Sequence, residues 1–222
     1  KGIETIIFVG GLSGKLEGEE MPVNFPGFKG GDRTNIELPS VQRNCLKALK
    51  QAGKKIIFVN CSGSAIALTP EIETCDAILQ AWYPGESGGQ AVADVLFGDY
   101  NPSGKLPITF YKNSDQLPDF ENYSMKGRTY RFMEDALFPF GYGLSYTRFE
   151  IGQAKLNKTE INENESVELT IPVKNIGKRD GTEIVQVYIR KVNDSDGPIK
   201  TLRGFQRVIV PSGKTVQAII HL

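Results

Sequence analysis

The chain has 222 residues, of which 40% are hydrophobic and 23% are charged, and this composition is that of a folded globular protein. Its 26 basic and 26 acidic residues give a formal net charge of zero, which disfavours nucleic acid or an anionic membrane as a partner and favours a sugar or another neutral small molecule. Three cysteines without a CxxC pair do not suit a disulfide framework and one histidine does not suit a metal site, so we expect core cysteines, no metal and no cofactor.

The first predicted element is a strand over residues 3–9. Its apolar, β-branched side chains are typical of a strand that is buried on both faces of a parallel sheet. Because this pattern begins almost at the first residue, we expect the complete protein to continue before Lys1. No apolar run has the length needed to cross a bilayer, so the sequence predicts no membrane partner.

A glycine-rich, acidic loop follows from Val9 to Arg33 and is far longer than most connections between a strand and a helix. In parallel sheets, ligands bind outside the carboxyl ends of the strands, which puts this loop at the predicted binding edge. The cluster of Glu17, Glu19 and Glu20 indicates general-acid chemistry, and the alternative is a solvated acidic loop.

Residues 38–97 alternate helix and strand patterns with short connections, which predicts parallel strands joined by right-handed crossovers. The predicted order is a helix from residue 38 to Gly53, a strand over 55–60, a helix from Thr69, a strand over 77–82 and a helix over 90–97. The buried face of the first of these helices is expected to comprise Val41, Cys45, Leu46 and Leu49. A second glycine-rich turn, 83–89, is expected at the same edge of the sheet as the acidic loop.

Residues 98–148 are rich in proline, glycine and aromatic residues and show little periodicity. We interpret them as an ordered connector whose aromatic side chains are buried against the first domain. Within it, residues 125–131 are expected either to line a cleft or to form a packed hairpin.

Beyond residue 149 the pattern changes to alternation of apolar and polar residues. Val167, Leu169, Ile171 and Val173 alternate with polar neighbours, as in a half-buried antiparallel strand. Further strands are predicted over 183–190, 202–210 and the last residues of the chain. Short strands at this spacing, separated by turn residues, predict a β-sandwich.

Several short sequence motifs, taken together and in this order, are highly specific for one protein family. They are Leu16-Glu17-Gly18-Glu19, Gly31-Asp32-Arg33-Thr34, Leu38-Pro39, Trp82-Tyr83-Pro84-Gly85, Ala93-Asp94-Val95-Leu96-Phe97-Gly98, Asn101-Pro102-Ser103-Gly104-Lys105-Leu106-Pro107 and Phe138-Pro139-Phe140-Gly141-Tyr142-Gly143-Leu144-Ser145-Tyr146. With these strings, the chain resembles glycoside hydrolase family 3 over essentially its whole length, and the acidic loop looks most like that of the β-xylosidase branch.

The resemblance implies a fold that agrees with the patterns. It implies an α/β/α sandwich with a mostly parallel sheet over residues 1–110, lacking its N-terminal part, a connector over 111–148, and a fibronectin type III-like β-sandwich over 149–222 that is short at its C-terminus. The family's (β/α)8 barrel, which normally precedes this region, is absent from the chain and is therefore the expected partner domain. The sequence gives no indication of oligomeric state.

The resemblance also implies a chemistry. The family removes terminal β-linked sugars with retention, using an aspartate nucleophile on the barrel and a glutamate acid/base in the loop after the first strand of this region. Members often carry that glutamate directly after a glycine at the strand end, where this chain has Gly11-Leu12. The role therefore falls on Glu17 or Glu19, with Glu17 slightly ahead and Glu20 third.

Other residues of the same strings have weaker expected roles. Arg33 and Tyr83 are candidate sugar contacts, although an ion pair between Asp32 and Arg33 and a core position for Trp82 are preferred to sugar contacts by those residues. The expected substrate is an oligosaccharide, and the expected location is the periplasm or the extracellular space.

Three functional classes stay open from the sequence. The leading one is the C-terminal part of an exo-acting β-xylosidase, or of a β-glucosidase of the same family. The second is a structural or carbohydrate-contacting module, because half of the catalytic pair is absent and the isolated chain is expected to be inactive. The third, a nucleotide-binding α/β protein, is disfavoured because the turn after the first strand lacks GxGxxG spacing.

Overall fold

The computed structural model describes residues 2–17 and 21–222, and these fall into two compact units. The first unit holds residues 1–92, 108–128 and 134–139, and the second holds 93–107, 129–133 and 140–222. Parallel β-structure with helices in the first unit and antiparallel β-structure in the second confirm the predicted fold class.

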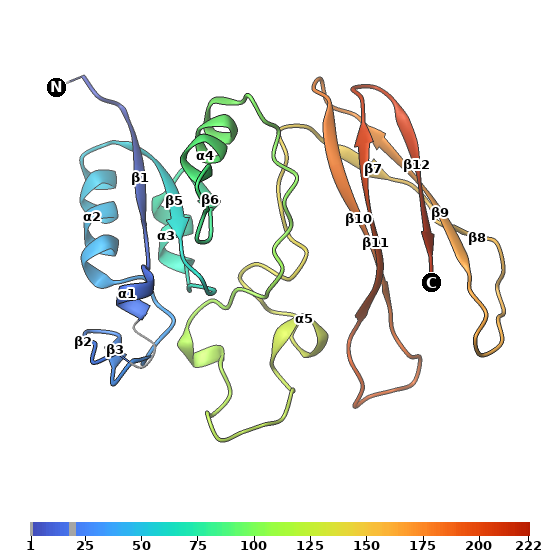
Figure 1. Ribbon diagram of the computed structural model, residues 1–222, viewed down its shortest axis with the longest axis horizontal. Helices are drawn as coiled ribbons and strands as arrows, with labels where there is room; N and C mark the ends of the chain where they lie inside the picture. The colour runs from blue at the N-terminus through green and yellow to red at the C-terminus, as the bar shows by residue number, and fades with distance from the viewer. Residues whose placement is uncertain (1, 18–20) are drawn as a thin grey trace. The chain divides into compact units, whose positions relative to one another are not determined.

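The first unit is organised around a parallel sheet with the strand order β1-β5-β6 (Figure 1). These strands are β1 (Thr5–Gly11), β5 (Lys55–Cys61) and β6 (Ala77–Gln80). The central strand β5 supplies the core, since Ile56 and Phe58 have no exposed surface. β5 pairs in parallel register with both neighbours, so the carboxyl ends of all three strands lie at one edge of the sheet.

The prediction that the first strand is buried on both faces is wrong for the described residues. β1 lies at the edge of the sheet, and its exposure alternates along the strand. Ile7 is 44% exposed and Val9 is 65% exposed, whereas Phe8 packs against Phe58 with ring centroids 5.8 Å apart. An apolar run therefore identified a strand but not the number of its faces that are covered.

The helices α2 (Ser40–Gln51) and α3 (Thr69–Thr74) accompany the sheet, and α4 (Gly88–Phe97) begins in the first unit and ends in the second. α2 packs against β1, β5 and α3. Its predicted apolar face is wrong in part, because Leu46 is buried but Val41 is 64% exposed and Cys45 is exposed. Gln42 and Arg43 lie on the inner side instead, where each makes hydrogen bonds to residues distant in the sequence.

The long loop after β1 contains regular structure of its own. It begins with the single-turn helix α1 (Gly14–Glu17) and continues through β2 (Asn24–Phe25), β3 (Phe28–Lys29) and β4 (Asp32–Arg33), which form a small antiparallel sheet in the order β2-β3-β4. Phe28 anchors this sheet, since only 6% of it is exposed. The antiparallel pairing returns the chain to Arg33 before α2 begins.

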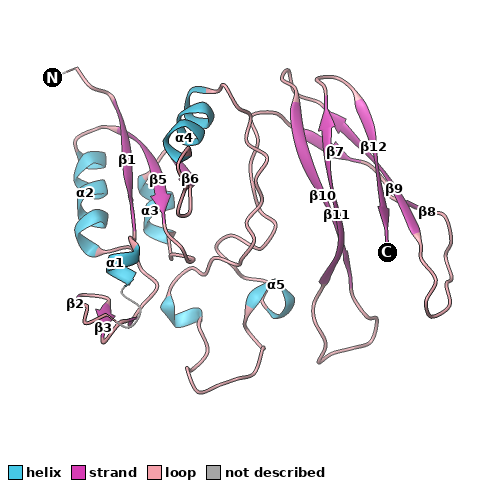
Figure 2. Cartoon of the chain, in the orientation of Figure 1, coloured by secondary structure: helices cyan, strands magenta, loops and turns pink. Residues whose placement is uncertain are grey.

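The connector is mainly loop, with two short helical turns, η1 (Ser114–Gln116) and α5 (Thr129–Phe132), as Figure 2 shows. In the first unit, Phe110 is 1% exposed and packs edge-on against both Trp82 and Phe138. Trp82 is half-buried and lies beside the buried core rather than in it, so the predicted core position is only partly met. In the second unit, Tyr130 stacks on Phe140 with ring centroids 4.5 Å apart.

The second unit contains two antiparallel sheets. One pairs β10 (Gly181–Ile189) with β11 (Thr201–Val210), and the other joins β12 (Thr215–His221), β9 (Glu168–Asn175), β7 (Phe149–Ile151) and β8 (Lys155–Leu156). Their shared core includes Leu169, Ile171 and Val173, as the alternation predicted, together with Val185, Val208, Val210, Ala218 and Ile220.

The three cysteines have different environments. Cys75 is buried, Cys61 is half-buried and Cys45 is exposed, so the expectation of three core cysteines is wrong for Cys45. Burial and the charge of Glu71 raise the pKa of the Cys75 thiol to about 11, which keeps it protonated. Within residues 2–17 and 21–222, no helix has the length and hydropathy of a membrane span.

Candidate active site

Three side chains meet beyond the carboxyl ends of the three parallel strands. Glu17 follows β1, Ser64 follows β5 and Tyr83 follows β6. Because the strands are parallel and in register, the segments that leave them emerge at one edge of the sheet. This arrangement places a carboxyl group, a hydroxyl and a phenol together although they come from three separate parts of the sequence.

The end of β1 is fixed before the chain reaches Glu17. Gln42 of α2 bonds Gly11 reciprocally: the Gly11 amide donates to Gln42 Oε1 at 2.8 Å, and Gln42 Nε2 donates to the Gly11 carbonyl at 2.7 Å. The next residue, Leu12, is 4% exposed, and its amide donates to the Cys61 carbonyl. Gly11 has a φ of +119°, and a Cβ there would lie 2.0 Å from the Cys61 oxygen, so the turn requires glycine.

The single turn α1 then presents Glu17. Its first turn is closed by Ser13, whose Oγ accepts a hydrogen bond from the Leu16 amide and whose carbonyl accepts one from the Glu17 amide. The Glu17 side chain is half-buried, so its carboxylate is reachable from solvent while its backbone is held.

Both oxygens of the Glu17 carboxylate accept hydrogen bonds. Ser64 Oγ donates to Oε1 at 3.0 Å, and Tyr83 OH donates to Oε2 at 2.6 Å. Hydrogen bonds from hydroxyls to a carboxylate are charge-assisted and fix its orientation. The carboxyl group therefore has a defined position although it lies on a long loop.

Arg33 supports Ser64 from the other side. Its Nη1 donates to Ser64 Oγ at 2.9 Å and its Nε donates to the Asn35 carbonyl at 3.2 Å. The Ser64 hydroxyl thus accepts from Arg33 and donates to Glu17. Burial lowers the pKa of Arg33, and the negative charges of Glu17 and Glu37 partly offset this, but a guanidinium stays protonated at working pH.

Two features place Tyr83 against Glu17: the backbone conformation of the preceding residue, and the space left by a glycine beside the ring. Trp82 has a φ of +59°, a conformation that costs on the order of 1–3 kcal/mol in a residue other than glycine. On the other side, a Cβ at Gly63 would lie 2.7 Å from the Tyr83 ring and 3.3 Å from Glu17 Oε2. Only glycine at position 63 therefore leaves room for the contact between Tyr83 and Glu17.

The ionisation of Tyr83 gives a test of this contact. Burial and the hydrogen bond to Glu17 raise the pKa of Tyr83 to about 12, so the phenol stays a donor at any working pH. The pKa of Tyr83 in the folded protein therefore lies above the usual tyrosine pKa of about 10. The neutral phenol stabilises the folded state fully below pH 10, and this stabilisation is lost as the pH rises towards 12.

We therefore expect an alkaline titration to show the ionisation of Tyr83 near pH 12, as the difference between the tyrosinate absorbance of the wild type and that of Tyr83→Phe. A Tyr83 ionisation near 10 would contradict the contact with Glu17.

The other candidate site residues predicted from the sequence differ in outcome. Glu19 and Glu20 lie outside the described residues. Among the described contacts, Arg33 bonds Asn35, Ser64 and the Ala65 carbonyl, so the predicted ion pair with Asp32, an exposed residue, is wrong. Sequence reasoning missed Ser64 and Gly63, whose only signal is their position directly after a parallel strand.

A buried polar layer lies under the site. Asn60 and Ser62 have no exposed surface, and Asn60 Nδ2 donates to Ser62 Oγ at 3.2 Å and to Gln80 Oε1 at 2.6 Å. Ser62 Oγ in turn donates to the Ser64 carbonyl at 2.9 Å, which fixes the residue that contacts Glu17. The described residues contain no group of His, Cys, Asp and Glu side chains that could hold a metal ion.

Residues 1–146 match the family model described as the glycosyl hydrolase family 3 C-terminal domain, and residues 183–222 match the fibronectin type III-like domain. Over its full length the chain is 64% identical to a xylan 1,4-β-xylosidase of Xylanibacter ruminicola and covers 26% of that protein. It is 40% identical over 206 residues to a periplasmic β-glucosidase of Salmonella typhimurium, an alignment that covers 86% of this chain and 27% of the relative.

Solved structures show the same fold. A β-glucosidase from Erythrobacter marinus aligns with a TM-score of 0.82 at 38% identity, over 99% of this chain and 29% of its own. A β-glucosidase from Kluyveromyces marxianus in complex with glucose aligns with a TM-score of 0.81 at 32% identity, over 98% of this chain and 26% of its own. The chain thus spans little more than a quarter of the length of these relatives.

Proposed function

The chain belongs to glycoside hydrolase family 3, and from this membership we propose that it is the C-terminal part of a retaining exo-acting β-glycosidase in which Glu17 is the catalytic acid/base. The enzyme removes terminal β-linked sugars, xylose in particular, from oligosaccharides. The nucleophilic carboxylate comes from the barrel domain of the complete enzyme, which precedes this region.

One observation carries the assignment of Glu17. Its carboxylate is held by Ser64 and Tyr83 at the carboxyl edge of a parallel sheet, which is where ligands bind in such folds. A catalytic carboxyl group must be oriented to within a fraction of an ångström, and two charge-assisted hydrogen bonds supply that orientation. Glu17 also keeps an accessible side, as a group that exchanges protons with a substrate must.

The chemistry needs two carboxyl groups about 5 Å apart. In the first step the nucleophile attacks the anomeric carbon while Glu17 donates its proton to the departing glycosidic oxygen. In the second step Glu17 removes a proton from water, and the water displaces the nucleophile to release the sugar with its original configuration. Tyr83 and Ser64 hold the carboxyl group through both steps.

The relatives support xylose over glucose as the terminal sugar. The identity to the β-xylosidase is 64% across the whole chain, against 40% to the β-glucosidase of Salmonella typhimurium. A periplasmic relative also supports a periplasmic or extracellular location, where oligosaccharides from polymer breakdown are met.

The complete enzyme is expected to hydrolyse an aryl β-xyloside with a higher kcat/KM than the matching β-glucoside. Proton NMR during turnover should show the β-anomer of the free sugar first, since two displacements retain configuration. The 222-residue chain alone should show no turnover, because it supplies one of the two carboxyl groups. A preference for glucoside would reassign the sugar, and release of the α-anomer first would contradict the proposed mechanism.

A further inference from the structure

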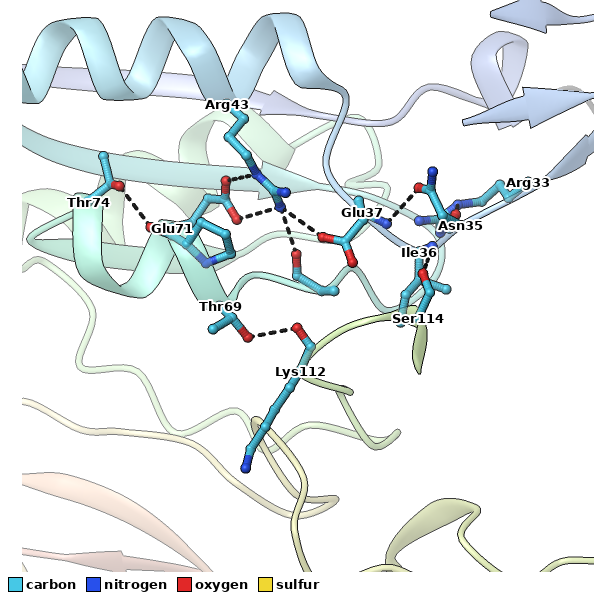
Figure 3. Close-up of polar contacts among 12 residues, drawn as sticks. Arg33, Asn35, Ile36, Glu37, Arg43, Thr69, Glu71, Thr74, Lys112 and Ser114 are labelled. Carbon is cyan, nitrogen blue, oxygen red and sulfur yellow. Dashed lines mark hydrogen bonds and ion pairs between the residues drawn. The ribbon is translucent and has the colours of Figure 1, made fainter. Parts of the chain in front are cut away.

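A groove with a volume of about 600 Å³ lies in the first unit, between the segment that carries Arg33 and the loop of residues 114–128. Arg33, Asn35 and Ile36 line one wall, and the Ile36 amide donates to Ser114 Oγ at 3.2 Å where the two walls meet (Figure 3). Its volume is in the range of small-molecule sites.

Two aromatic side chains in the opposite wall are almost fully exposed. Phe120 is 94% exposed and Tyr123 is 91% exposed, and both line the groove. Exposure of large aromatic surface has no packing function in the unit itself, and such surface commonly marks a binding site. Flat aromatic rings beside amide and guanidinium donors suit a ligand whose rings have apolar faces and hydroxyl edges, as sugars do.

The backbone of the loop that carries these aromatic residues is held by hydrogen bonds within the loop. The guanidinium of Arg128 donates to three backbone carbonyls of the loop, those of Asp119, Asn122 and Ser124. Side-chain caps at Asp119 and Asn122 also bond the amides two residues further on. A backbone held in this way lowers the entropy cost of ordering the loop on binding.

Arg33 connects the groove to the candidate active site. One of its nitrogens donates to Ser64, which bonds the Glu17 carboxylate, and another, Nη2, is buried without a hydrogen-bond partner among the described residues. Arg33, which lines the groove, is therefore one side chain away from the Glu17–Ser64 contact, and the groove and this contact both lie in the first unit.

We propose that this groove binds the leaving-group side of a β-linked xylo-oligosaccharide, with sugar rings of the substrate on Phe120 and Tyr123. This inference rests on the proposed function. It predicts that substrate length, and not only the terminal sugar, determines turnover, because a longer chain reaches the groove while its terminal residue is at Glu17.

The test compares xylotetraose with xylobiose in the complete enzyme. In the double variant Phe120→Ala/Tyr123→Ala, the ratio of kcat/KM for xylotetraose to kcat/KM for xylobiose should fall about tenfold, since each lost ring contact contributes roughly a factor of three. Phe97→Ala, which removes an aromatic residue of similar exposure that does not line the groove, should leave this ratio unchanged.

A second measurement makes the test independent of turnover. Calorimetric binding of xylotetraose to a Glu17→Gln enzyme should weaken when Phe120 and Tyr123 are replaced, with no change in melting temperature. An unchanged ratio and unchanged affinity would overturn the proposal. An equal loss for both substrates together with a lower melting temperature would also overturn it, because it would show that the rings pack against another domain. Absence of activity on every glycoside would contradict the proposed function alone, and the binding measurement would still decide the groove.

Discussion

Replacing Glu17 by alanine in the complete enzyme is expected to lower kcat for xylosides with poor leaving groups by about 10²–10⁴-fold, which is the usual contribution of general acid–base catalysis. Departure of an alkoxide without a proton is the slow step in that variant. Substrates with good leaving groups should lose less in the first step, since their oxygen departs as a stable anion.

Azide then distinguishes a catalytic role from a structural one. In Glu17→Ala, water lacks a base for the second step, but azide needs none and can displace the nucleophile at the anomeric carbon to give the β-glycosyl azide. Turnover of an activated aryl xyloside should therefore rise with azide. Glu86→Ala, which removes an exposed carboxylate from the same turn as Tyr83, should retain activity and show no rescue.

Parallel variants decide between the acidic residues of the loop. Glu19→Ala and Glu20→Ala should keep most of the activity if Glu17 is the acid/base. Azide rescue in one of them, combined with full activity of Glu17→Ala, would transfer the role to that residue. Isosteric Glu17→Gln should match Glu17→Ala in activity, because the amide preserves the shape but cannot exchange a proton.

The sequence predicted the strands that build the active-site edge but not the contacts at that edge. Short apolar runs bounded by turn residues identify β1, β5 and β6 as strands. Ser64 and Gly63 have no such pattern, since a small polar residue and a glycine after a strand are typical of any turn. Their roles arise from Glu17 and Tyr83, which are 46–47 and 19–20 residues away in the chain.

The same limit explains the errors on α2. A periodicity argument assigns Arg43 and Gln42 to solvent because they are polar, yet both point inward. Their partners are Glu71 and Gly11, 28 and 31 residues away, and nothing local in the sequence announces such pairs. Burial of a charged side chain becomes predictable only when its opposite charge is known to lie nearby.

Replacing Glu71 by alanine should produce the largest loss of stability in the first unit. Glu71 is 1% exposed, and Arg43 Nε donates to its Oε1 at 2.7 Å while Nη2 donates to its Oε2 at 3.1 Å, a bidentate pair (Figure 3). Although burial alone would lower the pKa of Arg43, the hydrogen bonds and charges of Glu71 and Glu37 raise it, so the guanidinium stays charged. Removing Glu71 leaves this charge partly buried and less well paired, at a cost of about 3–5 kcal/mol.

The single tryptophan makes the measurement specific. Trp82 lies in the first unit, against Phe110, so its fluorescence during urea denaturation of the 222-residue chain follows that unit alone. Lys50→Ala is the matched control: it breaks an ion pair to Asp76 whose two partners are both 45% exposed, and exposed pairs contribute about 0–1 kcal/mol.

A double variant separates the cost of an unpaired charge from the contribution of the pair itself. Arg43→Met/Glu71→Leu removes both charges and keeps much of the buried volume, and buried ion pairs replaced in this way often lose little stability. We therefore expect the double variant to be more stable than Glu71→Ala. Equal losses of stability in both variants would show that the pair itself is stabilising, through the contacts of Arg43 with Glu37 and the Ala67 carbonyl. These contacts hold the segment that leads back to Arg33. A loss below 1 kcal/mol in Glu71→Ala would show that the Arg43 charge finds solvent, and would contradict the burial on which the prediction rests.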